Sequence, residues 1–223
     1  MIWIALGAAC SRAPIEDRWN YGTITQLKDS FTSNFVLKTE VDGNTGWIVI
    51  DTGFNKNSVP LVEFLEEQNA TIDEILHVVA THGHKDHIGA HANFPNATFH
   101  VHQNDVSLLE AEGITNIEPF EGNVPLDIEG ITFIPFLLPG HTEGNVAYLV
   151  NEVLIMGDSG QSTKDGSIEI AGGGFTENPE LAVQSLLGLK EQIAPYIDQV
   201  QWVVFSHSGP LQGVDAIVEY TGP

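Results

Sequence analysis

Hydrophobic residues in this chain fall in short runs that are bounded by Gly, Pro, Asn or Asp. Two such runs, residues 35–39 and 47–50, flank the turn-forming segment 42–46, which predicts a β-hairpin near the start of the fold. The other runs of strand length are residues 75–80, 98–102, 131–137, 146–150, 153–156 and 202–205. Only Asn151 and Glu152 separate two of these runs, so a second, tight hairpin is expected there.

Two segments have the apolar spacing of amphipathic helices. In residues 58–69 the apolar positions face away from a run of glutamates, and Pro60 falls in the first turn, where proline is tolerated. The second helix is expected to begin at Asn178, a capping residue followed by proline, and to end before Pro195. Because strands come first and then alternate with helices, the order predicts sheets that are covered by helices.

Length and composition indicate one domain. The chain has 223 residues, of which 42% are hydrophobic, and this is enough for a sizeable core. After about residue 20 there is no repeat of fixed period, low-complexity tract or linker-like stretch. Residues 21–223 are therefore expected to form a single domain, with residues 1–20 set apart from it.

The N-terminal segment has two interpretations. An apolar run over residues 1–9 precedes Cys10 and a polar, tether-like stretch follows it, which is typical of a bacterial lipoprotein signal ending at a lipidated cysteine. This interpretation predicts a lipid anchor through Cys10 to a membrane, in the bacterial periplasm or cell envelope. Alternatively, the run is a buried N-terminal strand with a chance cysteine, and the protein is cytoplasmic.

The charge of the chain restricts its partners. It has 30 acidic and 8 basic residues, for a formal net charge of −22, and a surface of that sign repels polyanions. No nucleic-acid partner is therefore expected, and the expected partner is a small-molecule substrate. Lys164 is the only basic residue between Lys85 and Lys190, so no cationic substrate-binding patch is expected in the middle of the chain. The pattern does not indicate an oligomeric state.

Metal-ligating residue types gather directly after the predicted strand at 75–80. The pattern His-x-His-x-Asp-His supplies His82, His84, Asp86 and His87 from one strand-end loop. Neutral imidazole nitrogens and carboxylate oxygens are ligand types that zinc accepts. Since the chain has a single cysteine, any metal must be held by histidines and carboxylates.

Three later residues have the same chemistry. His141, Asp158 and His207 each stand at the end of a predicted strand or hairpin, beside glycine or other small residues. Together with the earlier motif, and in this order, they resemble the metallo-β-lactamase superfamily over about residues 21–210. The resemblance implies an α/β (α+β) fold, namely a four-layer αβ/βα sandwich with its metals at the sheet edge.

The resemblance also implies the ligand set. One metal would be held by His82, His84 and His141, and a second by Asp86, His87 and His207. Asp158 would bridge the two. The implied cofactor is two Zn²⁺ per chain, with iron or manganese as alternatives.

Two divalent ions lower the pKa of a shared water to near neutrality, so that a metal-bound hydroxide can attack a carbonyl. Asp86 would orient this water and pass its proton to the leaving group, which makes it the expected catalytic residue. Asp51 is interpreted either as support for the histidine loop or as a turn-forming residue. The remaining histidines are interpreted as packing or surface residues: His77, His91, His100 and His102.

Within the family, Asp158 resembles the glyoxalase II, lactonase and phosphodiesterase branches, since true β-lactamases normally lack this carboxylate. Only a short segment follows His207, whereas glyoxalase II carries a C-terminal helical domain that binds glutathione. Gln161 stands where quorum-quenching lactonases usually have tyrosine. The expected function is hydrolysis of a small ester, thioester or lactone. The alternatives are a mononuclear iron oxidoreductase like the persulfide dioxygenases, a β-lactamase, or a phosphodiesterase.

Overall fold

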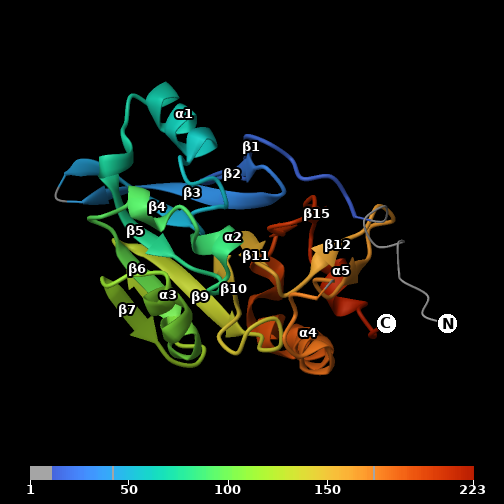
Figure 1. Ribbon diagram of the computed structural model, residues 1–223. Helices are drawn as coiled ribbons and strands as arrows, with labels where there is room; N and C mark the ends of the chain where they lie inside the picture. The colour runs from blue at the N-terminus through green and yellow to red at the C-terminus, as the bar shows by residue number, and fades with distance from the viewer. Residues whose placement is uncertain (1–11, 42, 173) are drawn as a thin grey trace.

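The computed structural model describes residues 12–41, 43–172 and 174–223. Two β-sheets face one another, and helices cover the outer face of each sheet (Figure 1). This is the predicted α+β fold with four layers in the order α/β/β/α. Cys10 and the apolar run before it lie outside the described residues, so both predictions for this segment stay open.

The first sheet follows chain order. It is antiparallel over its first four strands and parallel from there on. Phe35 pairs with Ile50, which confirms the predicted first hairpin, although both strands are longer than the apolar runs that predicted them. The strands are β1 (Trp19–Asn20), β2 (Ile24–Asp29), β3 (Thr32–Val41), β4 (Asn44–Ile50), β5 (Ile75–Val79), β6 (Thr98–His102) and β7 (Ile117–Phe120).

The second sheet has the order β15-β14-β11-β10-β9-β8. Val150 pairs with Val153 across the two intervening residues, which confirms the second hairpin, and Asn151 adopts the positive φ of 53° that its turn requires. The strands are β8 (Leu126–Ile128), β9 (Ile131–Leu137), β10 (Val146–Val150), β11 (Val153–Ile155), β14 (Trp202–Val204) and β15 (Leu211–Gln212). A separate two-stranded sheet joins β12 (Gln161–Ser162) to β13 (Ile168–Glu169).

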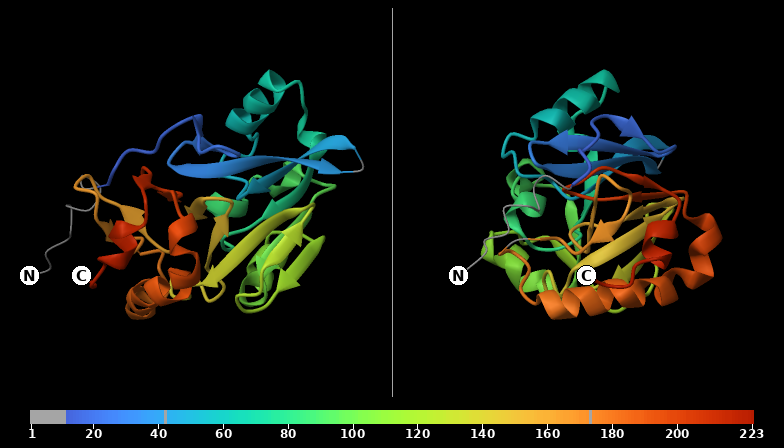
Figure 2. Two further views of the ribbon diagram at one scale, coloured as in Figure 1. Left: turned by 180° about the vertical axis from the view of Figure 1, so that it is seen from behind. Right: turned by 90° about the vertical axis from the view of Figure 1, so that its right-hand side faces the viewer.

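Both predicted amphipathic helices are present, as α1 (Val59–Glu67) and α4 (Pro179–Ile193). The Asn178 side chain accepts a hydrogen bond from the Leu181 N–H at 3.1 Å, so Asn178 caps α4 as predicted. The two helices lie on opposite outer faces of the sandwich in both views of Figure 2. Short α-helices are α2 (Lys85–Ile88), α3 (Val106–Ala111) and α5 (Asp215–Val218), and 3₁₀ turns cover Ile72–Glu74, His91–Asn93, Gln103–Asp105 and Ala194–Gln199.

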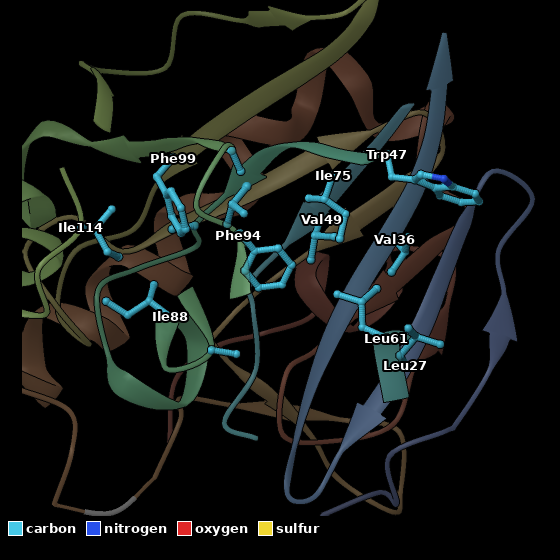
Figure 3. Close-up of a cluster of buried hydrophobic side chains, with 14 of the residues drawn as sticks. Leu27, Val36, Trp47, Val49, Leu61, Ile75, Ile88, Phe94, Phe99 and Ile114 are labelled. Carbon is cyan, nitrogen blue, oxygen red and sulfur yellow. The ribbon is translucent and has the colours of Figure 1, made fainter. Parts of the chain in front are cut away.

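Three buried apolar clusters hold the layers together. In the first, Leu61 of α1 joins Leu27 and Val36 of the first sheet (Figure 3). The second lies between the sheets, and the third packs α4 against the second sheet. Burial of apolar area on this scale is the main term that favours folding.

The hydrophobic pattern did not predict β2, because this strand buries polar residues. Gln26 is fully buried and its side chain is satisfied on both ends, accepting from the Tyr21 hydroxyl at 2.7 Å and donating to the Ser33 hydroxyl at 2.8 Å. β7 was also missed, since it carries Pro119 and stands at the edge of its sheet, where a missing N–H is tolerated.

In the part of the chain that the structure describes, we find no helix with the length and apolarity needed to cross a bilayer.

Candidate metal centre

The loop after β5 and the start of α2 carry four of the predicted ligands. His82 and His84 lie in the loop, and Asp86 and His87 lie in α2. A Cβ at Gly83 would stand 2.4 Å from the Cβ of Leu108, so the loop can take this path only with glycine there. His82 and His87 are fully buried, which directs them inward beneath the surface of the site.

Three other strand-end loops bring the remaining ligands to the same place. His141 lies between β9 and β10, Asp158 follows β11 and His207 follows β14. Backbone hydrogen bonds tie these loops together: the Val146 N–H donates to the Thr81 carbonyl at 2.9 Å, and the Ser206 N–H donates to the Gly157 carbonyl at 3.4 Å. Residues far apart in sequence are thus held at one edge of the sandwich.

The first predicted ligand group is assembled. Nitrogen atoms of His82, His84 and His141 all lie within 4.8 Å of one another. His84 Nδ1 is 2.9 Å from His141 Nε2, and the centroid of each of these three rings lies 4.7 Å from those of the other two. Three imidazoles that converge in this way can hold one divalent ion.

The second predicted group is also assembled. Ligand atoms of Asp86, His87 and His207 lie within 4.8 Å of one another. Asp86 Oδ2 is 3.1 Å from His207 Nε2 and 3.7 Å from His87 Nε2. This carboxylate and two imidazoles can hold a second ion.

Asp158 stands between the two groups. Its Oδ2 lies 3.2 Å from His141 Nε2 on the first side. Its Oδ1 lies 3.3 Å from His207 Nε2 and 3.5 Å from His87 Nε2 on the second side. One carboxylate therefore presents a different oxygen to each ligand group, which is one way for a carboxylate to bridge two ions.

The donor atoms fit a divalent metal. His82 Nε2, His87 Nε2 and Asp158 Oδ1 are buried, and none of them has a hydrogen-bond partner. A buried polar atom without a hydrogen-bond partner is energetically costly. Three such electron-pair donors at one place are therefore what a binding site for a metal ion requires. Nitrogen and oxygen donors without sulfur suit zinc, iron or manganese.

Hydrogen bonds from behind fix the orientation of the histidines. The fully buried Asp51 accepts from His87 Nδ1 at 2.7 Å, which leaves His87 Nε2 facing the site. Asp51 also accepts from the Thr81 N–H and hydroxyl, both at 2.8 Å, and so anchors the start of the histidine loop. It has the positive φ of a turn residue, 58°, so both interpretations of Asp51 describe its place in the structure.

His141 and His207 are oriented in the same way. The Thr176 hydroxyl donates to the Ala171 carbonyl, so it accepts from His141 Nδ1 at 3.1 Å. His207 Nδ1 donates to the Phe31 carbonyl at 2.7 Å. In both residues Nε2 is the nitrogen left free for a ligand role.

The sequence analysis missed Asp105, which is buried beneath the site. Its Oδ2 accepts from the Gly83 N–H at 2.9 Å and from the Thr142 hydroxyl at 2.7 Å, and its Oδ1 accepts from the Gly144 N–H at 2.7 Å. One carboxylate thereby joins the His82–His84 loop to the His141 loop. The available signal was its position just after β6, which lies beside β5 in the parallel part of the sheet.

The electrostatics of the site favour ionised carboxylates and two neutral histidines. Burial lowers the pKa of His82 well below its usual range and that of His141 to about 4. Burial alone would raise the pKa of Asp158, but the nearby His87 and His207 hold it well below the usual value. Burial opposes the charge of His207, yet Asp158 and Asp86 raise its pKa to about 10.

A cleft of about 620 Å³ opens over the ligands. Asp86 and Asp158 lie on its floor, and Phe31, Phe54 and Phe175 stand in its walls. Ala171 and Gly172, at the start of a glycine-rich stretch, also line it. The other histidines stand apart from the described ligand groups; His77 and His100 instead form a hydrogen-bonded pair at 3.0 Å.

Comparisons with known proteins agree with this geometry. The model of the metallo-beta-lactamase superfamily matches residues 31–109. A hydroxyacylglutathione hydrolase from Vibrio parahaemolyticus is 32% identical over 158 residues, which cover 70% of this chain and 56% of the relative. Another, from Shewanella loihica, is 30% identical over 142 residues, which cover 61% of this chain and 51% of the relative. The chain therefore spans about half the length of the curated relatives it matches.

The fold has solved counterparts. The crystal structure of a metallo-beta-lactamase family protein from Thermus thermophilus superposes with a TM-score of 0.63 at 17% identity, covering 88% of this chain and 77% of that one. The motif order, the four-layer sandwich and the matched relatives all lead to the same assignment. The chain belongs to the metallo-β-lactamase superfamily.

Proposed function

We propose that this protein is a dinuclear, zinc-dependent hydrolase of a small ester, thioester or lactone. The observation that carries the proposal is the position of Asp158, whose two oxygens face two separate groups of ligands. A site for a single ion would not need a carboxylate between two complete sets of donors.

Two divalent ions bound here would supply a hydroxide at neutral pH and polarise the oxygen of the substrate carbonyl. Asp86 is partly exposed on the floor of the cleft, where it can accept the proton of the attacking water and deliver it to the leaving group. Asp51 and Thr176 hold the histidines in one tautomer and one orientation. The cleft orients the substrate and limits the access of water.

The matched relatives support a thioester within this range. They are named hydroxyacylglutathione hydrolases, and that name specifies an acyl group carried on glutathione. Gln161 lines the cleft at the position where lactonases usually have tyrosine, which favours esters and thioesters over lactones.

An activity panel tests the proposal. Chelator-free protein would be assayed on a thioester, a lactone, a phosphodiester and a β-lactam, with oxygen consumption followed on an electrode in a parallel persulfide assay. Thioester or ester hydrolysis that is abolished by a chelator and restored by zinc is the expected result. Oxygen uptake with persulfide would instead assign the site to the dioxygenase class.

We also propose a lipid anchor at Cys10, as the apolar run before it suggests. Cell fractionation of the wild type and of Cys10→Ser tests this. The variant should move from the membrane fraction to the soluble fraction, and an unchanged distribution would rule the anchor out.

A further inference from the structure

Basic side chains gather in the lining of the cleft and of a cavity beside it, although the molecule as a whole is strongly acidic. A second cavity of about 560 Å³ adjoins the cleft and shares Phe54 and Lys85 with it. Three of the eight Lys and Arg residues of this chain, Arg12, Lys56 and Lys85, line the two cavities, although its net charge is −22. Among the described residues that line the two cavities, Glu112 is the only carboxylate apart from the predicted metal ligands Asp86 and Asp158.

Glu112 pairs with Lys85, one of these three cations, which leaves Arg12 and Lys56. Its carboxylate lies 2.9 Å from Lys85 Nζ. Arg12, in contrast, has no ion pair with any described residue, and its Nε is buried without a hydrogen-bond partner. A buried guanidinium donor without a partner is costly unless a ligand provides one.

The backbone of the next residue, Ala13, holds Arg12 beside the cleft. The Ala13 N–H donates to the Ser162 carbonyl and the Gly209 N–H donates to the Ala13 carbonyl, both at 3.1 Å. Arg12 itself forms an isolated antiparallel bridge with Thr163. The segment is therefore held between β12 and the loop that carries His207, so its guanidinium reaches the cleft from a defined position.

Apolar aromatic rings line the same cleft as the charged Arg12 side chain. The rings of Phe31 and Phe54 lie 5.0 Å apart, and Phe31 stacks on His207 with centroids 5.8 Å apart and an interplanar angle of 11°. Both phenylalanines are about half exposed, at 49% and 50%. Exposed aromatic rings beside a reactive centre offer a surface for an apolar group of a ligand.

We propose that the substrate is an apolar acyl compound with a carboxylate, that Arg12 binds this carboxylate, and that Phe31 and Phe54 contact the apolar part. This inference rests on the proposed hydrolase function and adds to it the substrate class and the residue that selects it. Arginine suits the role because its planar fork pairs with a carboxylate through two hydrogen bonds.

A matched pair of substrates tests the role of Arg12. S-(phenylacetyl)-3-mercaptopropanoate carries a carboxylate, and the corresponding propanamide has nearly the same shape without the charge. Arg12→Gln should lower kcat/KM for the carboxylate by about 10- to 100-fold, mainly through KM, and leave the amide within about twofold. Arg12→Lys should recover part of the loss.

The control is Arg18→Gln, since Arg18 pairs with Glu63 and Glu67 on α1 and is not among the residues that line either cavity. It should leave both substrates unaffected. An equal loss on both substrates in Arg12→Gln, or no loss on either, would overturn the proposal.

A binding measurement separates this inference from the proposed function. Titration of metal-free and zinc-loaded protein with 3-phenylpropanoate, followed by NMR, needs no turnover. If the wild type hydrolyses neither thioester but binds 3-phenylpropanoate at least tenfold more tightly than Arg12→Gln does, the hydrolase proposal fails and the carboxylate site stands. Equal affinity in the two proteins would overturn the carboxylate site whatever the activity.

Discussion

Asp158 lies between the two ligand groups of the candidate metal centre. Its oxygens lie 3.2 and 3.3 Å from nitrogens of different ligand groups, and these histidines are held from behind by separate hydrogen bonds. The geometry at this scale is preorganised, because ring orientation is fixed by contacts outside the site.

Asp86→Ala should remove the second metal and nearly all turnover while leaving the fold intact. Among the described residues, Asp86 is the only carboxylate that belongs to the second ligand group alone, and it is the expected proton carrier. Elemental analysis and thioester turnover would measure both effects. A matched control is Asp198→Ala at an exposed position, and full activity in Asp86→Ala would contradict the two-metal mechanism.

Most of the ligand set could be predicted from residues alone, because His-x-His-x-Asp-His packs several donors into one loop. Asp105 could not, since an isolated Asp in sequence does not reveal that three donors surround it. Arg12 was missed for a related reason: its segment is held at the cleft by backbone hydrogen bonds between Ala13 and both Ser162 and Gly209, which lie far along the chain.

At the scale of elements, the site is built from loops that leave the same end of several strands. β5 and β6 are parallel neighbours, and Asp105 connects the loop after β5 with the loop between β9 and β10. The strands themselves followed from apolar runs. The strands that the pattern missed are β2, which buries polar side chains, β7, which carries Pro119, and several strands of two or three residues.

Asp105→Ala should lower the free energy of unfolding by about 2–4 kcal/mol, because three buried donors lose their acceptor. Urea denaturation would measure this, with Asp198→Ala as the exposed control. Metal affinity should fall as well, since the two loops are no longer joined. A change of less than about 0.5 kcal/mol would show that the three hydrogen bonds to Asp105 do not stabilise the fold.

The β5 and β6 pair also makes stability depend on pH. His100 lies 3.0 Å from His77 and 3.9 Å from Glu118, and His77 lies 3.2 Å from Glu129. Burial lowers the pKa of His100 from 6.5 to about 4, with a further contribution from His77. Between these two values the unfolded chain binds a proton that the folded protein does not, so stability falls as the pH drops through this range.

His100→Gln should therefore flatten the dependence of unfolding free energy on pH between about 6.5 and 4, by up to about 3 kcal/mol. Urea denaturation at a series of pH values would measure it. His91→Gln, at a partly buried histidine outside this network, is the control and should keep the wild-type slope. If His100→Gln kept the wild-type dependence of unfolding free energy on pH, His100 would not be its source.

At the scale of the whole molecule, the charge around the candidate site differs from the charge of the rest of the chain. The chain as a whole is strongly acidic, whereas the cleft and the cavity beside it are lined by three basic side chains and by aromatic rings. The strand and helix pattern predicted sheets covered by helices, and the four layers could be predicted only through the family resemblance that the motif order carries. The composition of the cleft could not, since it depends on which distant loops meet.

The most direct test of the central claim is the metal content of the protein purified without chelator, measured by elemental analysis and repeated after zinc reconstitution. Two divalent ions per chain in the wild type, and about one in Asp86→Ala, are the predicted result. A single ion in both proteins, with no loss on substitution, would contradict a centre in which Asp158 bridges two metals.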